Sequence, residues 1–167
     1  VETGDSLRET QHQSLADTAA AWHDTLADVP PGPLLLIANE FFDALPVHQY
    51  EMTVAGWRER LVTWQGGACQ LQLAAEPSAL SRPGQAGDVF EQAPARNRYM
   101  ADIASRLESD GGAALVIDYG HGESANGDTL QAVRAHRAQS IFAEPGLADL
   151  TSHVDFEALG RAAAGVA

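Results

Sequence analysis

The sequence has no lysine: all ten of its basic residues are arginine, set against 23 aspartate and glutamate residues. The formal net charge is therefore −13 at pH 7. A charge of this sign repels phosphate backbones, so we expect no nucleic acid as a partner, but rather a basic protein segment or a cationic small molecule. Acidity that only keeps the protein in solution explains the composition equally well.

Cysteine, metal-ligand spacings and long apolar runs are also scarce. Cys69 is the single cysteine, which excludes a disulfide within the chain and fits a reducing compartment. The six histidines include no His-Cys or His-x-x-x-His spacing, so we expect no metal site. No apolar run approaches the length of a membrane span, and no basic segment precedes an apolar one as in a secretory signal, so we expect no membrane partner.

A length of 167 residues predicts one domain, spanning residues 1–167, with a substantial core. The chain opens without methionine, on what is predicted to be a strand end at residues 1–3, so we expect sequence upstream of it. Apolar spacing predicts a helix over 6–19, and a short strand over 20–23. Glu2 occupies the position that holds ribose hydroxyls in nucleotide-binding α/β folds, although a surface carboxylate is the simpler explanation for its position alone.

The chain is organised around an apolar run of strand length, Leu34–Ala38. Turn residues precede it, a pattern typical of a strand buried on both faces. Asn39, Glu40 and Asp43 follow at the carboxyl end, where open α/β sheets bind their ligands. Asn39 and Asp43 are also good capping residues, so a purely structural turn is the alternative.

A second apolar run, residues 113–118, ends in Asp118 and Tyr119 in the same manner. The helix predicted over 95–107 precedes this run, and its periodicity puts Arg96 away from the apolar face. Two apolar runs separated by a helix predict parallel strands in one sheet. We therefore expect the polar residues at both carboxyl ends to open on the same edge.

Between these runs, residues 47–73 contain alternating stretches at 47–52, 56–64 and 69–73, separated by tight turns. This pattern predicts an antiparallel β-meander. Insertions after the carboxyl end of a strand tend to form the wall of a binding cleft. We therefore expect the meander to lie outside the main sheet and to cover the cleft.

Several motifs resemble those of a known family: Asn39–Pro46, Gly56–Arg60, Ile117–Gly120, Gly127–Gln131 and Ala148–Phe156. In this order, and nearly end to end, the chain resembles the MidA family of S-adenosylmethionine-dependent methyltransferases. That family includes bacterial proteins and a mitochondrial complex I assembly factor that methylates a protein arginine. The resemblance implies an α/β fold, a partial Rossmann-like class I methyltransferase sheet with the meander inserted.

The resemblance also implies S-adenosylmethionine as the cofactor and an arginine-containing protein segment as the substrate. It implies the cytoplasm for bacterial members and the mitochondrial matrix for eukaryotic relatives. The family's Gly-rich loop has no counterpart here, so we expect a truncated domain that binds the cofactor weakly or not at all by itself. By resemblance, the residues around the cofactor are Glu2 at the ribose, Trp22, His23 and Asp24 near the adenine, and Asn39 and Glu40 near the transferred methyl.

Methyl transfer from a sulfonium needs an in-line nucleophile held close, which depends mainly on positioning and electrostatics. Carboxylates bind a guanidinium in a bidentate fork and localise its charge on one nitrogen. The acids predicted to do this follow strand ends: Glu40, Asp43, Asp118 and Glu91. For Glu40 the alternative is an internal ion pair with Arg58 or Arg60, which would only steady the meander.

Three aromatic residues next to these acids, Phe41, Phe42 and Tyr119, are expected to exclude water and to stack on a planar cation. Burial in the core is the alternative for Phe41 and Phe42. Two rival functions also stay open: a non-catalytic protein-binding or assembly module, and a methyltransferase of small molecules. The missing Gly-rich loop favours the module for this chain, and the intact acidic motifs favour an enzyme.

Overall fold

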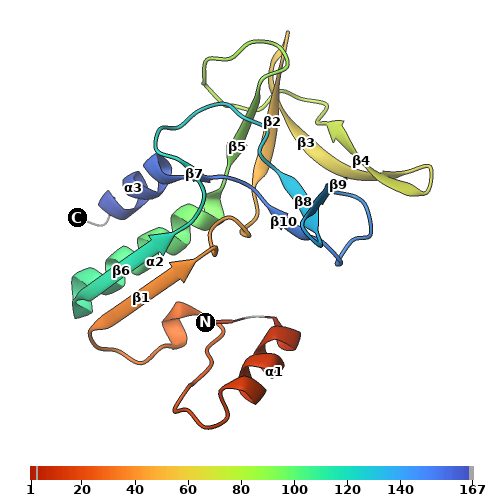
Figure 1. Ribbon diagram of the computed structural model, residues 1–167. Coiled ribbons are helices and arrows are strands. Elements are labelled where there is room, and N and C mark those ends of the chain that lie inside the picture. Colours follow the sequence, from red (N-terminus) through yellow and green to blue (C-terminus); the bar gives the residue numbers. More distant parts are fainter. Residues whose placement is uncertain (3, 166–167) are drawn as a thin grey trace.

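The computed structural model describes residues 1–2 and 4–165, and a parallel strand pair crosses it beside a long helix (Figure 1). β1 (Leu34–Asn39) pairs with β6 (Gly112–Ile117), and Asn39 lies opposite Ile117. The predicted parallel pair is therefore confirmed. The helix α2 (Pro94–Asp110) precedes β6 and ends at Gly111, whose φ of 76° suits glycine.

The core lies between α2, β1 and the C-terminal segment. Its buried residues are Ala38, Phe42, Ile103, Val154 and Leu159. On the other face of β1, Leu35 and Ile37 are 87% and 74% exposed. The predicted burial on both faces is thus wrong for the described part of the chain. Successive side chains of a strand point to opposite faces, so α2 shields only alternate residues.

A second sheet has the strand order β4-β3-β2-β5 and antiparallel pairing throughout. Its strands are β2 (His48–Thr53), β3 (Gly56–Gln65), β4 (Ala68–Leu73) and β5 (Val89–Gln92). The first three of these overlap the stretches predicted within 47–73, whereas β5 was not predicted. The expected role of 47–73 as an inserted wall over a cleft stays a prediction.

The C-terminal part alternates short strands with loops and ends in a helix. β7 (Gly120–His121) pairs in parallel with β11 (Val154–Asp155). β8 (Gln131–Arg134) lies between β9 (Arg137–Gln139) and β10 (Asp149–Thr151), antiparallel to both. The last helix is α3 (Phe156–Ala164), and Figure 1 shows it near the N-terminal end of α2. The chain therefore returns to the core after leaving it at β8–β10.

The N-terminal segment is less regular than predicted. α1 (Asp5–Ser14) is followed by a turn, so the predicted helix over 6–19 is too long at its C-terminal end. The strand predicted over 20–23 is wrong: those residues belong to no strand of the described structure, and the short 3₁₀ helix η1 (Leu26–Asp28) follows. α1 buries none of its residues. Tertiary packing, which supplies most of the stability of helices in proteins, therefore does little to extend this helix. Of the strand end predicted at residues 1–3, residue 3 lies outside the described residues.

Of the helices in the described residues, none is both long enough and apolar enough to cross a membrane.

Candidate functional site

The loop after β1 holds Glu40 in a backbone conformation that side-chain-bearing residues seldom adopt. Glu40 has a φ of 46°, in the left-handed region that favours glycine. Its backbone N–H donates to the carbonyl oxygen of Ile117 at 2.9 Å, at the end of β6. This bond ties the residue to the neighbouring strand while leaving its side chain exposed.

Asp118, at the end of β6, organises the same loop. Its Oδ2 accepts the backbone N–H groups of Phe42 at 3.0 Å and of Asp43 at 3.2 Å. Its Oδ1 accepts the N–H of Tyr119 at 2.9 Å. The Asp118 carboxylate, which was predicted to bind substrate, thus accepts hydrogen bonds from the backbone of the loop that carries Glu40 and Asp43. Its assignment to substrate binding stays a prediction.

A first pocket, of about 350 Å³, lies at the carboxyl end of β1. Its lining includes Glu2, Asn39 and Glu40, three of the residues predicted to surround the cofactor. The Glu2 carboxylate accepts the N–H of Gly4 at 2.7 Å and the side-chain amide of Gln11 at 3.4 Å. The fold therefore brings together acids that are nearly 40 positions apart in the sequence.

The residues predicted near the adenine lie beside Glu2 but outside the lining of this pocket. The Glu2 N–H donates to the carbonyl oxygen of His23 at 3.2 Å. The indole N–H of Trp22 donates to Gln11 Oε1 at 2.7 Å, and Asp24 pairs with Arg8. Trp22, His23 and Asp24 therefore lie close to Glu2. Their role at an adenine stays a prediction.

A second pocket, of about 630 Å³, opens on the other side of the loop. Glu40, Asp43 and Tyr119 line it, opposite residues of β8 and β10: Gln131, Val133, Asp149, Leu150 and Thr151. Glu40 lines both pockets. Neither Asp149 nor Thr151 was assigned to a site from the sequence, although both belong to the motif Ala148–Phe156 that carried part of the family resemblance.

Asp43 and Tyr119 form the inner wall of this second pocket. Asp43 is 4% exposed, and its buried Oδ1 has no hydrogen-bond partner among the described residues. Burial and the neighbouring Asp43 carboxylate together raise the pKa of the Tyr119 hydroxyl. The phenol therefore stays protonated at neutral pH, beside the Asp43 carboxylate.

The two phenylalanines of the loop differ in exposure. Phe42 is completely buried in the core, so it presents no surface to a substrate in this structure. Phe41 is half-buried and lines the first pocket. Its ring packs edge-on against Phe42 and Tyr99, with centroid distances of 5.2 and 5.4 Å. Core packing accounts for Phe42, whereas Phe41 serves both the core and the pocket wall.

Glu91 lies on β5, away from both pockets that Glu40 lines. Its Oε1 accepts the side-chain amide of Gln49 at 2.8 Å and the backbone N–H groups of Thr129 and Leu130 at 3.0 and 3.1 Å. Its carboxylate therefore holds the loop before β8 against the second sheet. The structure does not bring Glu91 together with Glu40, and its substrate role stays a prediction.

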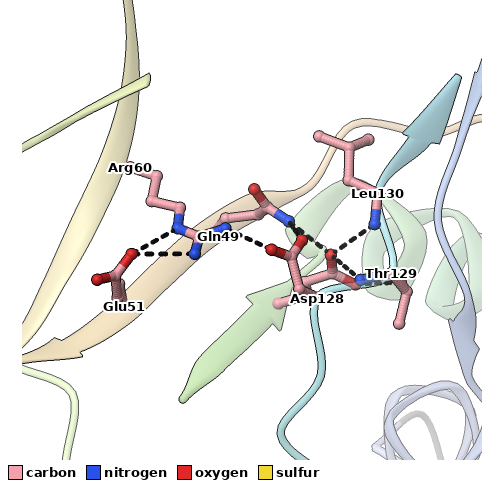
Figure 2. A network of polar contacts seen from close by, with 7 residues as sticks. Gln49, Glu51, Arg60, Asp128, Thr129 and Leu130 are labelled. Atoms are coloured by element: carbon pink, nitrogen blue, oxygen red, sulfur yellow. Dashed lines mark hydrogen bonds and ion pairs between the residues drawn. The ribbon is translucent and has the colours of Figure 1, made fainter. Parts of the chain in front are cut away.

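The arginines considered as partners of Glu40 are occupied elsewhere, so the internal ion-pair alternative is wrong. Figure 2 shows Arg60 bonded to Glu51 and Asp128, at 2.9 and 2.7 Å. Burial alone would lower the pKa of Arg60, but its bonds to these two carboxylates outweigh burial and raise it. Arg58 donates to the carbonyl oxygens that follow β4. Glu40 is thus left facing the pockets.

Arg96 is a residue whose position the helical pattern misjudged. It lies in the first turn of α2 and is 3% exposed, although the pattern put it away from the apolar face. Its guanidinium reaches the loop after β1 and the segment before β11. No local signal in the sequence announces this, because its partners are more than 50 positions away.

Histidine, cysteine and acidic side chains form no group of three or more with metal-binding geometry within residues 1–2 and 4–165. The polar side chains that line the two adjoining pockets include carboxylates, an amide and a phenol.

Known proteins resemble this chain in sequence and in structure. A mitochondrial protein arginine methyltransferase NDUFAF7 homolog of Drosophila melanogaster is 41% identical over 152 residues, covering 84% of this chain and 34% of the relative. The human mitochondrial protein arginine methyltransferase NDUFAF7 is 36% identical over 151 residues, covering 87% and 34%. The chain thus spans about a third of the length of these curated relatives.

A solved structure has the same fold. It is that of a COG1565 superfamily member from Burkholderia thailandensis bound to S-adenosyl-homocysteine, 27% identical, with a TM-score of 0.78 over 98% of this chain and 46% of that one. The mixed α/β fold is therefore shared. The model of a family of S-adenosyl-L-methionine-dependent methyltransferases matches residues 1–167. The chain accordingly belongs to this family of S-adenosylmethionine-dependent methyltransferases, as its MidA-like motifs predicted.

Proposed function

We propose that the protein containing this chain transfers a methyl group from S-adenosylmethionine to an arginine side chain of another protein. The position of Glu40 carries the proposal, because this residue lines two adjoining pockets, one on the side of Glu2 and Asn39 and one on the side of Asp43 and Tyr119. A side chain that acts on both the cofactor and the substrate has to lie where their two pockets adjoin. The names of the curated relatives support arginine as the acceptor.

The first pocket fits the cofactor side. Glu2 offers carboxylate oxygens at the position expected for ribose hydroxyls, and Asn39 adds an amide at the end of a parallel strand, where α/β sheets bind nucleotides. The parallel β1–β6 pair supports a Rossmann-like class I arrangement. When bound, S-adenosylmethionine would supply the methyl group. Because the Gly-rich loop is missing from these 167 residues, we expect the chain alone to bind it weakly or not at all.

The second pocket fits a guanidinium. Glu40 and Asp149 offer carboxylates at its rim. The buried Oδ1 of Asp43 has no hydrogen-bond partner within the described part of the chain, so it could accept an N–H of a guanidinium. Methylation of a guanidinium nitrogen releases one proton, and a carboxylate such as Glu40 can accept it. Bound in a fork, the carboxylates of the pocket localise the positive charge on one nitrogen, so that the reacting nitrogen keeps its lone pair.

The backbone of Glu40 supports a functional role. A left-handed conformation at a residue other than glycine costs on the order of 1–3 kcal/mol and persists where the surroundings enforce it. Such conformations gather at active sites. The backbone bond from Glu40 to Ile117 helps to hold this conformation, and the side chain stays exposed.

Residues 47–73 are proposed as a wall of the substrate side. Gln49 and Arg60 both bond to Asp128, at 2.8 and 2.7 Å, as Figure 2 shows. Asp128 lies shortly before Gln131, which lines the second pocket. The second sheet is thereby fastened to the segment that forms the pocket's outer side.

Glu40→Gln in the full-length protein tests the proposal. The change keeps size and hydrogen bonding but removes charge, so we expect arginine-peptide methylation to fall at least about a hundredfold, as for loss of a transition-state contact. Cofactor affinity by calorimetric titration and the melting temperature should hardly change. The matched control is Glu144→Gln, because Glu144 is also exposed and has a φ of 45°. Methylation by Glu40→Gln at close to the normal rate would refute the role of Glu40 in holding the guanidinium.

The rival function is a non-catalytic assembly module, and titration of the full-length protein with S-adenosylmethionine separates the methyltransferase from this module. Absence of binding would favour the module. Methylation of free arginine or another small molecule, but of no peptide, would favour the small-molecule enzyme instead. Methylation of arginine within peptides is the outcome that we expect.

A further inference from the structure

Arg96 lies where a cation is costly. Its side chain is 3% exposed, and it takes part in none of the ion pairs found within the described part of the chain. Burial lowers the pKa of the guanidinium, and the more distant carboxylates of Glu91, Asp118 and Asp43 act against that lowering. A buried charge of this kind is tolerated where hydrogen bonds replace its water.

Backbone carbonyl groups and a hydroxyl provide those bonds, and they come from two separate segments. Nη2 donates to the carbonyl oxygen of Asp43 at 3.0 Å and to the carbonyl oxygen and Oγ of Ser152 at 3.1 and 2.6 Å. Nη1 donates to the carbonyl oxygen of His153 at 2.6 Å. The Ser152 N–H closes the arrangement by donating to the same Asp43 carbonyl oxygen at 3.1 Å.

The two segments are the opposite walls of the second pocket. Asp43 belongs to the loop that carries Glu40, and Ser152 directly follows Thr151 of β10. The guanidinium therefore sits behind the pocket and joins its walls. A planar group with donors pointing in several directions can satisfy acceptors from both sides, whereas a lysine ammonium on its flexible stem cannot match this geometry.

We propose that Arg96 is a positioning residue, which fixes the distance between the Glu40 loop and the segment Thr151–His153 and thereby shapes the pocket for the arginine substrate. The proposal rests on the function proposed above for that pocket. Arg96 itself does not line the pocket and acts through the backbone of Asp43 and Ser152.

The test compares Arg96→Met and Arg96→Lys with the matched control Arg98→Met in the full-length protein. Arg98 is an exposed arginine two positions along the same helix. For Arg96→Met we expect the amide hydrogens of Asp43 and Ser152 to exchange at least about tenfold faster, while amides of the β2–β3 pair keep their rates. Arg96→Lys should give an intermediate increase, and Arg98→Met none.

The kinetic readout separates positioning from general support of the fold. For Arg96→Met we expect the KM for an arginine peptide to rise at least about fivefold, while the dissociation constant of S-adenosylmethionine changes by less than about twofold. Unchanged exchange at Asp43 and Ser152, or equal acceleration throughout the protein, would overturn the proposal. So would local acceleration with unchanged peptide kinetics.

Ser152→Ala provides a second route if Arg96→Met does not fold. It removes the hydroxyl acceptor at 2.6 Å from the guanidinium and keeps the charge, so the same local acceleration is expected to a smaller extent. If the wild-type protein methylates no arginine peptide, the proposed function fails. The exchange rates then still decide whether Arg96 ties the two segments.

Discussion

The carboxylate of Asp118 accepts the backbone N–H of Phe42 at 3.0 Å, across 76 positions of sequence. The bond joins the end of β6 to the loop after β1, so the loop's shape depends on a side chain from the neighbouring strand. Glu40 lies in this loop, and its own backbone N–H donates to the carbonyl oxygen of Ile117 at the end of β6. The backbone of Glu40 is therefore held by the same neighbouring strand.

Asp118→Ala should destabilise the fold as well as the site. The backbone N–H groups of Phe42 and Asp43 would lose their acceptor, and Asp43 is buried. We expect the free energy of unfolding, measured in urea, to fall by about 1.5–3 kcal/mol, the usual value for hydrogen bonds to a charged group. Asp102→Ala, at an exposed position of α2, is the control and should change it by less than about 0.5 kcal/mol. Equal effects would argue against an anchoring role.

Glu40→Gly should trade activity for stability. Glycine relieves the left-handed φ of 46°, which we expect to raise the free energy of unfolding by up to about 1 kcal/mol while methylation is lost. Ala135→Gly, in the turn between β8 and β9 with a φ of 49°, should give a similar gain and leave methylation intact. Thermal unfolding measures the change in stability, and a peptide assay measures the methylation. A Glu40→Gly protein that is less stable than wild type would show that the conformation carries no strain.

Asp110 should make stability depend on pH in the acid range. The N–H of Gly32, then Ser109 and Arg106, hold the pKa of this carboxyl below its ordinary value of 3.8. A pKa that is lower in the folded state means that the ionised form stabilises the fold, and this contribution is lost as pH falls through the folded pKa. Asp110→Asn should therefore lower the melting temperature by a constant amount above about pH 5, and by less below pH 3.8.

The control for this pH series is Glu108→Gln, at an exposed position of the same helix. It should leave the melting curve close to that of the wild type at every pH. A difference between wild type and Asp110→Asn that stays constant down to pH 2 or so would exclude the carboxylate as its source.

Gly84→Ala should disturb the second sheet through Trp57. A Cβ at position 84 would lie 2.6 Å from Cζ2 of this buried indole, which also donates its N–H to the carbonyl oxygen of Arg82. We expect overpacking to lower the free energy of unfolding by about 1–3 kcal/mol. Gly122→Ala meets nothing within 4 Å and is the control. No difference between the two variants in urea unfolding would mean that the loop at Gly84 moves freely aside.

Local pattern was enough for several elements of the fold. The runs at Leu34–Ala38 and 113–118 became a parallel pair, because apolar stretches bounded by turn residues and separated by a helix have few other solutions. Pattern failed where partners are remote. It predicted burial for Leu35 and Ile37, which are exposed, and exposure for Arg96, which is buried. Periodicity identifies faces of an element but does not say what covers them.

The same division holds for the site. The sequence by itself determined that Asn39, Glu40 and Asp43 lie at the carboxyl end of a strand, and the motifs around them determined the family. Both properties depend on neighbours along the chain. Only the tertiary structure decided that Glu91 holds Thr129 and Leu130, that Asp118 anchors Phe42, and that Glu40 faces two pockets. These carboxylates have the same chemistry but different roles, because each bonds to the groups that lie close to it in space. The folded chain sets which groups those are, and the local sequence does not.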